Sequence, residues 1–383
     1  MKPGRVGRCS DAGSTSRGRA LARRWTATGL LATVLAAPAV VRGEPYFAVQ
    51  QGAKCVTCHV NATGGGMRNA YGSTWGQRAL PARFVETGVA EAWTGKLNPY
   101  LALGGNLRAN ANYTDVPNQT STNEFDVEEL RLYLLVDAIP ERLSVYVDER
   151  VAPGSAVNLE AWGRYWFAEQ RWYVKAGQML LPFGVRLEDD SAFVRQATGI
   201  NFDTPDRGVE IGLETARWSA QLAVTNGTAG GAETDDGKQV STRAEYVRSG
   251  WRAGASFSLN ETEVGDRQLA GVFAGLRTGP VAWLAEADYI EDDGFPDGQR
   301  SQWAGLLEAN WAYRTGHNLK LTTEYFEPDE DVDEDEQSRW SLVWEYTPVQ
   351  FLQLRAGVRV YDGIPQSDLQ NRRFAFVQLN GYF

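Results

Sequence analysis

The sequence is poor in the residues that cross-link small secreted domains or build metal centres. Its 383 residues include 3 Cys, 2 His and 3 Met. We expect the segment that holds Cys9 to be removed, so the mature chain would keep two cysteines within one five-residue motif. A disulfide framework is therefore excluded. A structural zinc site is disfavoured because four ligands would have to include the adjacent Cys58 and His59.

Acidic residues outnumber basic ones, 48 to 38, and long apolar runs are scarce. The net charge of -10 argues against nucleic acid or an anionic lipid surface as a partner. After the N-terminal region there is no run of about eighteen apolar residues, which disfavours a membrane-spanning helix. Aromatic residues are plentiful, with 13 Trp, 15 Tyr and 15 Phe, yet the mean hydropathy is -0.38. This combination is typical of strands with one apolar face and one wet face.

Residues 1–43 have the pattern of a signal peptide. A basic stretch ends at Arg23 and Arg24, and an apolar run from 28 to 41 follows it. Cleavage is expected after Ala39 or Gly43. The protein is therefore predicted to leave the cytoplasm.

A c-type haem motif follows at Cys55-Val56-Thr57-Cys58-His59. Two thiols at this spacing reach the two vinyl groups of one porphyrin, and the adjacent histidine ligates the iron. A redox Cys-x-x-Cys would prefer a βαβ setting, and none is visible. We therefore predict one covalent haem c, held by Cys55 and Cys58 as thioethers with His59 as proximal ligand.

The sixth ligand of the iron is left open by the sequence. Outside the signal peptide the conventional choices are Met67, Met179 and His317. Met67 follows three glycines and could fold back over the haem, or it could be an apolar residue opening a short helix from Met67 to Gln77. His317 lies in a turn, where a solvated histidine is the default. A five-coordinate or water-ligated iron is the remaining choice.

From about residue 96 the hydrophobic pattern repeats every second residue. In the segment 353–361, Leu354, Ala356, Val358 and Val360 alternate with polar or small residues. About sixteen such segments predict an all-β fold, a transmembrane antiparallel barrel. The inward face should carry charges of both signs: Arg131, Arg164, Arg243, Glu245, Arg252, Glu286, Asp288, Glu308, Lys320, Glu324, Arg355 and Arg359.

Short turns and longer polar links are expected to alternate between these strands, as in bacterial barrels. Short turns are predicted near residues 139–140, 169–170, 249–250, 278–279, 315–316 and 347–348. The third long link, about Pro182 to Asp206, resembles the porin loop that folds inward and narrows the pore. The chain ends at Phe383 with apolar residues at every second position before it, a pattern that resembles the last strand of outer-membrane proteins.

The join of these two parts resembles a known family. Phe47-Ala48, Gly52 and the Cys-x-x-Cys-His motif ahead of a porin-like barrel are similar to the fused outer-membrane cytochrome–porins of iron-oxidising bacteria. The likeness is motif-specific over about Pro45 to Gly72. It implies haem in or near the pore and electron transfer across the outer membrane. Residues 61–66 depart from the iron-oxidiser pattern, so the likeness does not assign Fe(II) as donor.

The sequence thus predicts three parts and two functions. The parts are a signal peptide (1–43), a monohaem cytochrome c-like segment (44–93) and an outer-membrane barrel (94–383), with the haem segment on the periplasmic side or inside the barrel. The first hypothesis is electron transfer between an extracellular donor or acceptor and a periplasmic electron carrier. The second is a diffusion porin whose haem segment acts as plug, sensor or gate.

One further candidate site is the acidic run from Asp329 to Glu336. Its seven carboxylates could gather hard cations or Fe(II) at the outer mouth. The simpler interpretation is a solvated charge run that meets lipopolysaccharide through divalent ions. The expected partners of the barrel wall are the outer-membrane lipid and lipopolysaccharide.

Overall fold

The computed structural model describes residues 44–86, 92–233, 236–296 and 298–383. The predicted signal peptide, including Cys9, lies outside the described residues. Within them, no helix is long and apolar enough to cross a membrane.

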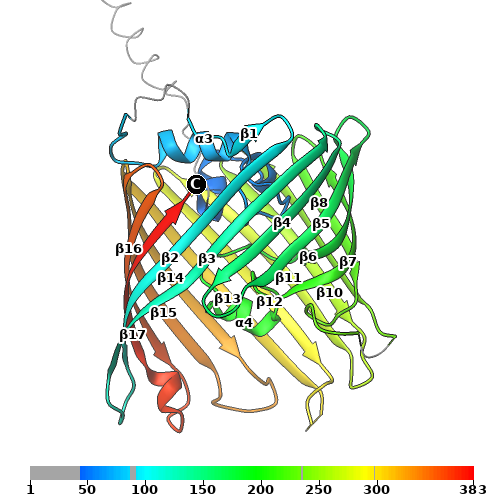
Figure 1. The fold of residues 1–383 in the computed structure, drawn as a ribbon. Coiled ribbons are helices and arrows are strands. Elements are labelled where there is room, and N and C mark those ends of the chain that lie inside the picture. The colour runs from blue at the N-terminus through cyan, green and yellow to red at the C-terminus, as the bar shows by residue number, and fades with distance from the viewer. Residues whose placement is uncertain (1–43, 87–91, 234–235, 297) are drawn as a thin grey trace, which may run out of the picture. The chain divides into compact units, whose positions relative to one another are not determined.

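The described chain forms a closed antiparallel barrel (Figure 1). Sixteen of its strands each pair with the next along the described chain, and the last pairs with the first to close the ring. A short additional strand, β1 (Lys96–Asn98), pairs with β2. The sixteen strands are β2 (Leu101–Asp115), β3 (Thr122–Ile139), β4 (Leu143–Ala152), β5 (Val157–Phe167), β6 (Trp172–Leu180), β7 (Pro205–Glu214), β8 (Trp218–Thr225), β9 (Gln239–Arg248), β10 (Trp251–Asn260), β11 (Arg267–Thr278), β12 (Val281–Asp292), β13 (Arg300–Arg314), β14 (His317–Glu327), β15 (Gln337–Val349), β16 (Leu352–Asp362) and β17 (Arg373–Tyr382).

The two-residue period sorts side chains between the lumen and the outer surface. In β10, Arg252 and Ser256 are buried inside while Trp251 and Phe257 are exposed outside. The charged residues predicted for the inner face are buried or nearly so; Glu245 and Asp288, for example, have 0% exposure. The last strand follows the same rule, because Val377, Leu379 and Phe383 face outward. The all-β barrel fold is therefore confirmed.

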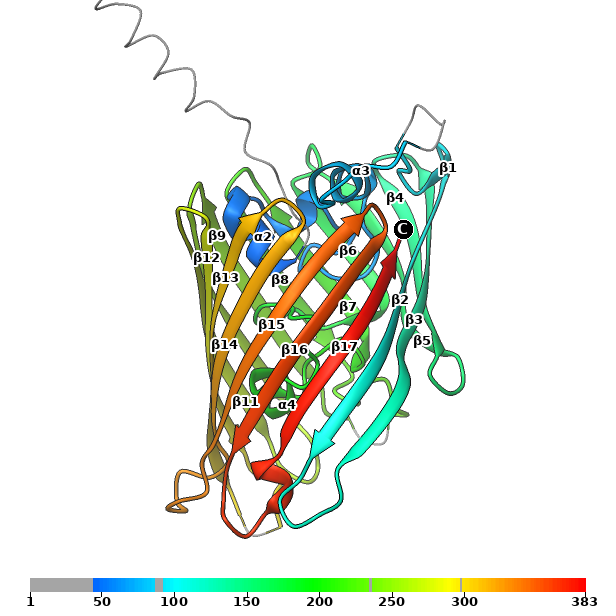
Figure 2. The same ribbon diagram turned by 90° about the vertical axis from the view of Figure 1, so that its left-hand side faces the viewer.

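Short turns lie at one end of the barrel and longer links at the other (Figures 1 and 2). The C-terminus lies at the short-turn end. One predicted turn is wrong: Thr347 and Pro348 continue β15, and the turn falls at residues 350–351. A proline is tolerated at that position because it lies at the end of the strand, where the hydrogen-bond ladder is already irregular.

The third long link, residues 181–204, folds into the lumen. It carries helix α4 (Phe193–Thr198), which packs against β12, β13 and β14. Apolar residues of the link, among them Leu187, Val194 and Ile200, form a buried cluster with Leu269 and Ile290 of the wall. The predicted inward-folding loop is therefore present, and Figure 2 shows α4 inside the ring of strands.

The segment before β1 occupies the short-turn end of the same lumen (Figure 2). It contains α2 (Pro45–Gln51), the 3₁₀ turn η1 (Cys55–Thr57) and α3 (Ala70–Ala79). The predicted helix from Met67 to Gln77 is corrected at its start, because Asn69 caps α3 by accepting the Gly72 amide at 2.9 Å. We call residues 44–86 the plug. Another short 3₁₀ helix, η2 (Asp368–Asn371), lies between β16 and β17.

Candidate functional site

The Cys-x-x-Cys-His motif lies in a tight turn that follows helix α2. Helix α2 ends at Gly52, whose φ of 61° suits glycine and whose amide bonds the Ala48 and Val49 carbonyls. The turn itself is closed by the Cys58 and His59 amides, which donate to the Cys55 carbonyl at 3.1 and 3.0 Å. Both cysteines are free thiols.

Asn69 fixes the motif to α3. Its side-chain amide donates to the Val56 and Thr57 carbonyls at 3.1 Å each, while its oxygen caps the helix. Helix α3 approaches the motif closely, since a Cβ at Gly72 would lie 2.1 Å from the Cys58 carbonyl oxygen. Neither Asn69 nor Gly72 was predicted from the sequence as part of the site. The sequence did contain a signal for a capped helix, because an asparagine precedes a short helical stretch.

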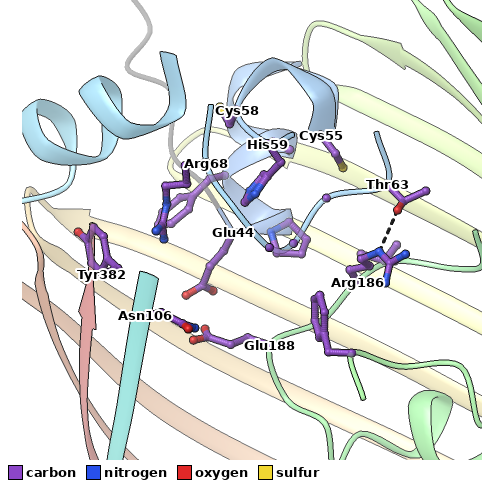
Figure 3. A pocket seen from close by; sticks show the side chains of 18 of the residues that line it. Glu44, Cys55, Cys58, His59, Thr63, Arg68, Asn106, Arg186, Glu188 and Tyr382 are labelled. Carbon is purple, nitrogen blue, oxygen red and sulfur yellow. Dashed lines mark hydrogen bonds between the residues drawn. The ribbon is translucent and has the colours of Figure 1, made fainter. Parts of the chain in front are cut away.

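Cys55, Cys58 and His59 all line one large cavity in the lumen (Figure 3). It encloses about 1430 Å³ that protein atoms do not fill, counting the part open to solvent. The plug, the wall and the inward link all contribute lining residues, including Phe47, Phe202 and Phe273. The cavity therefore offers apolar rings together with the three motif side chains.

The lining of the cavity is mainly cationic. Seven basic side chains line it, against the three carboxylates Glu44, Glu129 and Glu188. The basic residues are Lys54, Arg68, Arg108, Arg131, Arg186, Arg243 and Arg252. Arg252 reaches the motif itself, with Nη2 3.8 Å from Cys55 Sγ. A ligand that carries negative charge is therefore favoured here.

Several groups outside the strands have strongly shifted pKa values at this site. Burial raises the pKa of the Cys58 thiol to about 11, so it is a neutral thiol at neutral pH. Burial, reinforced by Glu345, raises the pKa of Glu44 to about 8 despite the opposing Lys320. The neighbouring Glu188 is also buried, but Arg355 and Arg108 hold its pKa at about 2. Near neutral pH the proton of this carboxyl pair therefore resides on Glu44.

Hydrogen bonds anchor the plug to the wall around its circumference. The Met67 amide donates to the Tyr146 hydroxyl at 3.0 Å, and Arg164 donates to the Val60 carbonyl at 2.7 Å. On the same strand as Arg164, Glu160 accepts a hydrogen bond from Asn61 at 2.6 Å. Additional contacts join Tyr46 to Glu345, Glu44 to Lys320, Lys54 to Glu214 and Arg277 to the Gln50 carbonyl. Because these partners come from strands spread around the ring, the plug spans the lumen.

The conventional sixth-ligand candidates lie away from the cavity. Met67 and Met179 are 2% and 0% exposed and pack with Tyr133 and Trp162 in an apolar cluster. His317 begins β14 and stacks on Tyr346, with ring centroids 4.4 Å apart. Apart from Met1, these are all the Met and His residues other than His59. The structure therefore brings His59 to the cavity with the two cysteines but not these three candidates.

The acidic run from Asp329 to Glu336 is mostly exposed and links β14 to β15 at the long-loop end. Among the described residues, no group of three or more His, Cys, Asp or Glu converges as a metal site would. Glu330 accepts a hydrogen bond from the Trp303 indole, and Asp329 pairs with Arg300 at 3.5 Å. The geometry fits a solvated charge run.

Comparison with known proteins identifies the fold. No protein-family model and no curated protein matches the sequence. Among solved structures, the chain is similar to the anion-selective porin of Comamonas acidovorans, with 13% identity, a TM-score of 0.60, and coverage of 74% of this chain and 99% of that one. It is similar to the OmpT outer-membrane protein of Vibrio cholerae in its loop L8 deletion form (12%, 0.59, 74% and 99%). It is also similar to the DcaP channel of Acinetobacter baumannii (13%, 0.56, 74% and 97%). The protein has the sixteen-stranded fold of outer-membrane porins.

Proposed function

We propose that the plug binds one haem c, attached through Cys55 and Cys58 and ligated by His59, and that the plugged barrel carries electrons across the outer membrane. The observation that carries the proposal is the shared cavity of these three side chains. Its apolar rings and the basic side chains that line it suit a large apolar cofactor with two carboxylates. When bound, the haem supplies one-electron iron chemistry.

The outer membrane is the proposed location because the outside of the barrel has the pattern that lipid requires. Apolar side chains such as Leu321, Leu342 and Val358 are exposed there. Exposed aromatic residues lie near both ends of the strands, with Trp251 at the short-turn end and Trp303 toward the long-loop end, as in the girdles of membrane barrels. Since short turns face the periplasm in such barrels, the plug would lie on the periplasmic side.

The chain's own residues would hold the redox group inside the membrane and limit water flow past it. A hydrocarbon layer of about 30 Å blocks electrons unless a cofactor lies within it. The plug is fixed by buried bonds such as Asn61 to Glu160, so it would keep a bound group at one depth. Electrons would pass between an extracellular donor or acceptor, Fe(II) among the candidates, and a periplasmic electron carrier.

A second candidate function is a diffusion channel in which the plug acts as gate or sensor. The similarity to solved porins supports a channel more directly than electron transfer. The large cavity between plug and inward link also suits the passage or retention of small solutes. The two functions differ in whether ions or electrons cross the intact barrel.

Ligation of the haem iron by Met67 on the distal side is still a prediction. As packed, its side chain fills the cluster beside Tyr133, so ligation would require it to leave that cluster. If it stays, the sixth position would be open to the cavity or taken by water. Cyanide added to the oxidised protein distinguishes the two states, because an open position binds it readily and a methionine-ligated one resists.

The test of electron transfer uses the intact protein in liposomes with an electron acceptor sealed inside and a membrane-impermeant donor outside. We expect the wild type to reduce the acceptor and His59→Ala to reduce little or none. His317→Ala is the matched control and should behave as wild type, because His317 stacks on aromatics away from the cavity. Ion conductance like that of an open porin, with no electron transfer, would refute the proposal in favour of the diffusion channel.

A further inference from the structure

The seven basic side chains of the cavity divide into two groups by their partners. Five form ion pairs with carboxylates. Lys54 pairs with Glu214, Arg108 with Glu128 and Glu129, Arg131 with Glu129 and Asp148, and both Arg243 and Arg252 pair with Glu245. Among the described residues, Arg68 and Arg186 form no ion pair with a carboxylate. These two guanidinium groups therefore bring positive charge into the lumen with no carboxylate in direct contact.

Arg186 is held by neutral groups alone. Its Nε donates to Thr63 Oγ1 at 2.9 Å, and its Nη2 donates to the Leu181 carbonyl at 3.1 Å. Its Cζ lies 5.6 Å from the centre of the Phe202 ring. Burial lowers the pKa of Arg186 to about 10, so the group remains charged at neutral pH. Glu160 and Glu210 act on this charge only from beyond ion-pair distance, so an anionic ligand in direct contact would offset the remaining cost of burying it.

Arg68, on the plug, contacts an aromatic ring. Its Cζ lies 4.4 Å from the centre of the Tyr382 ring, a neutral partner. Arg68 pairs with His59 in an isolated β-bridge, and its charge acts to lower the pKa of the Cys58 thiol. Arg68 is therefore tied directly to the residues of the haem motif.

Both groups face the same cavity from different elements, as Figure 3 shows, with Arg68 on the plug and Arg186 on the inward link. The Arg186 bond to Thr63 joins that link to the loop that follows His59. A haem c attached at Cys55 and Cys58 carries two propionates on the part of the ring remote from its thioethers. Guanidinium groups bind carboxylates strongly because two parallel N–H donors match the two oxygens.

We propose that Arg68 and Arg186 bind the propionate carboxylates of the haem, and so position it and set its reduction potential. The inference rests on the proposed haem attachment. In this arrangement the inward link contributes one of the two anion-binding groups, Arg186. The link thereby completes the site opposite the plug. The same chemistry would suit a free anion in the channel, such as phosphate or a small dicarboxylate, and the experiment separates these sources.

The test measures reduction potential against pH by spectroelectrochemistry on the full-length, detergent-solubilised protein. The variants are Arg68→Gln, Arg186→Gln and Arg186→Lys, with Arg171→Gln as control because Arg171 is 60% exposed in the turn between β5 and β6. We expect both glutamine variants to keep the covalent haem stain and to show a lower potential, since a nearby positive charge favours the reduced iron. Their potentials should also change with pH in a range where the wild type is flat, because a propionate that loses its cation has a higher pKa. Arg186→Lys should retain part of the wild-type potential.

Each other outcome has a definite meaning. Unchanged potentials and pH profiles in both glutamine variants, with haem retained, would overturn the propionate assignment and leave haem attachment standing. A wild-type potential that varies with added phosphate or succinate, and loses this dependence in the glutamine variants, would assign the arginines to a free anion instead. A wild-type protein without haem would refute the proposed function itself. Heat-modifiable mobility on a gel checks that each variant forms the barrel, and Arg68→Gln tests the site if Arg186→Gln does not fold.

Discussion

The barrel wall and the plug are built by different rules. In the wall one rule, alternation with a period of two, assigns each side chain to lipid or lumen over sixteen strands. In the plug, two short helices and a 3₁₀ turn are held by individual bonds, such as Tyr46 to Glu345. The wall is a fold shared with porins at 13% identity or less in the comparisons above. The features specific to this chain are concentrated where plug, inward link and wall meet.

The largest effect is expected when the plug is removed and the wall is kept. Deletion of residues 44–93 should leave a folded barrel, because its strands close on one another without the plug. Its single-channel conductance in planar bilayers should rise several-fold over the full-length protein, since the plug spans the lumen. Replacement of the exposed link 329–336 by Gly-Ser of equal length is the control and should conduct as wild type. Equal conductance with and without the plug would contradict its role as a closure.

A second test asks whether the wall holds the plug through single bonds. Tyr146→Phe removes the hydroxyl that accepts the Met67 amide and leaves that amide buried without its partner. The expected cost is about 1–3 kcal/mol, which is roughly a 5- to 150-fold increase in local opening. Hydrogen exchange of the plug amides measures this effect.

Tyr165→Phe is the matched control for this test. Tyr165 lies on the neighbouring strand but is 44% exposed on the outer face, so its loss should not change exchange in the plug. Equal exchange in the two variants would mean that the plug does not depend on the Tyr146 contact.

The sequence predicted the wall far better than the plug because periodicity is a local signal. Alternation in 353–361 needs no knowledge of the partner strands, and neither does the apolar pattern before Phe383. The partners of Arg164 or Glu160 depend on the register of the whole closed sheet, which brings residues about a hundred positions apart into contact. The two unpaired arginines could not be recognised either, because their lack of a carboxylate appears only when all neighbours are placed.

The Cys-x-x-Cys-His motif was predicted better than the ligand that would complete its iron site. The spacing of Cys55, Cys58 and His59 predicted one site, and the structure brings all three to one cavity. Met67 follows a flexible glycine run and was a plausible ligand by sequence distance, yet its side chain lies in a core formed with the wall. Proximity in sequence does not determine which face of a loop meets the cavity.

Docking of the plug should depend on pH through Glu44. Its pKa is about 8 when docked and near 4.5 when free, so docking is strongest below pH 4.5 and weakens as the pH rises toward 8. Glu44→Gln should remove this dependence, because a neutral amide replaces the protonated carboxyl. Exchange rates of the α2 amides between pH 5 and 8 measure it, with the exposed Glu86→Gln as control. An identical pH profile in wild type and Glu44→Gln would rule this group out.

The most direct test of the central claim is whether the plug carries a covalent haem. The protein, expressed with a c-type haem maturation system, is denatured, separated by electrophoresis, stained for haem and weighed by mass spectrometry beside Cys55→Ala/Cys58→Ala. We predict that the wild type keeps the stain and the added mass of one haem, and that the double variant keeps neither while still forming a heat-modifiable barrel. A correctly folded wild-type protein with the bare polypeptide mass and no stain would contradict the account and leave a plugged porin in its place.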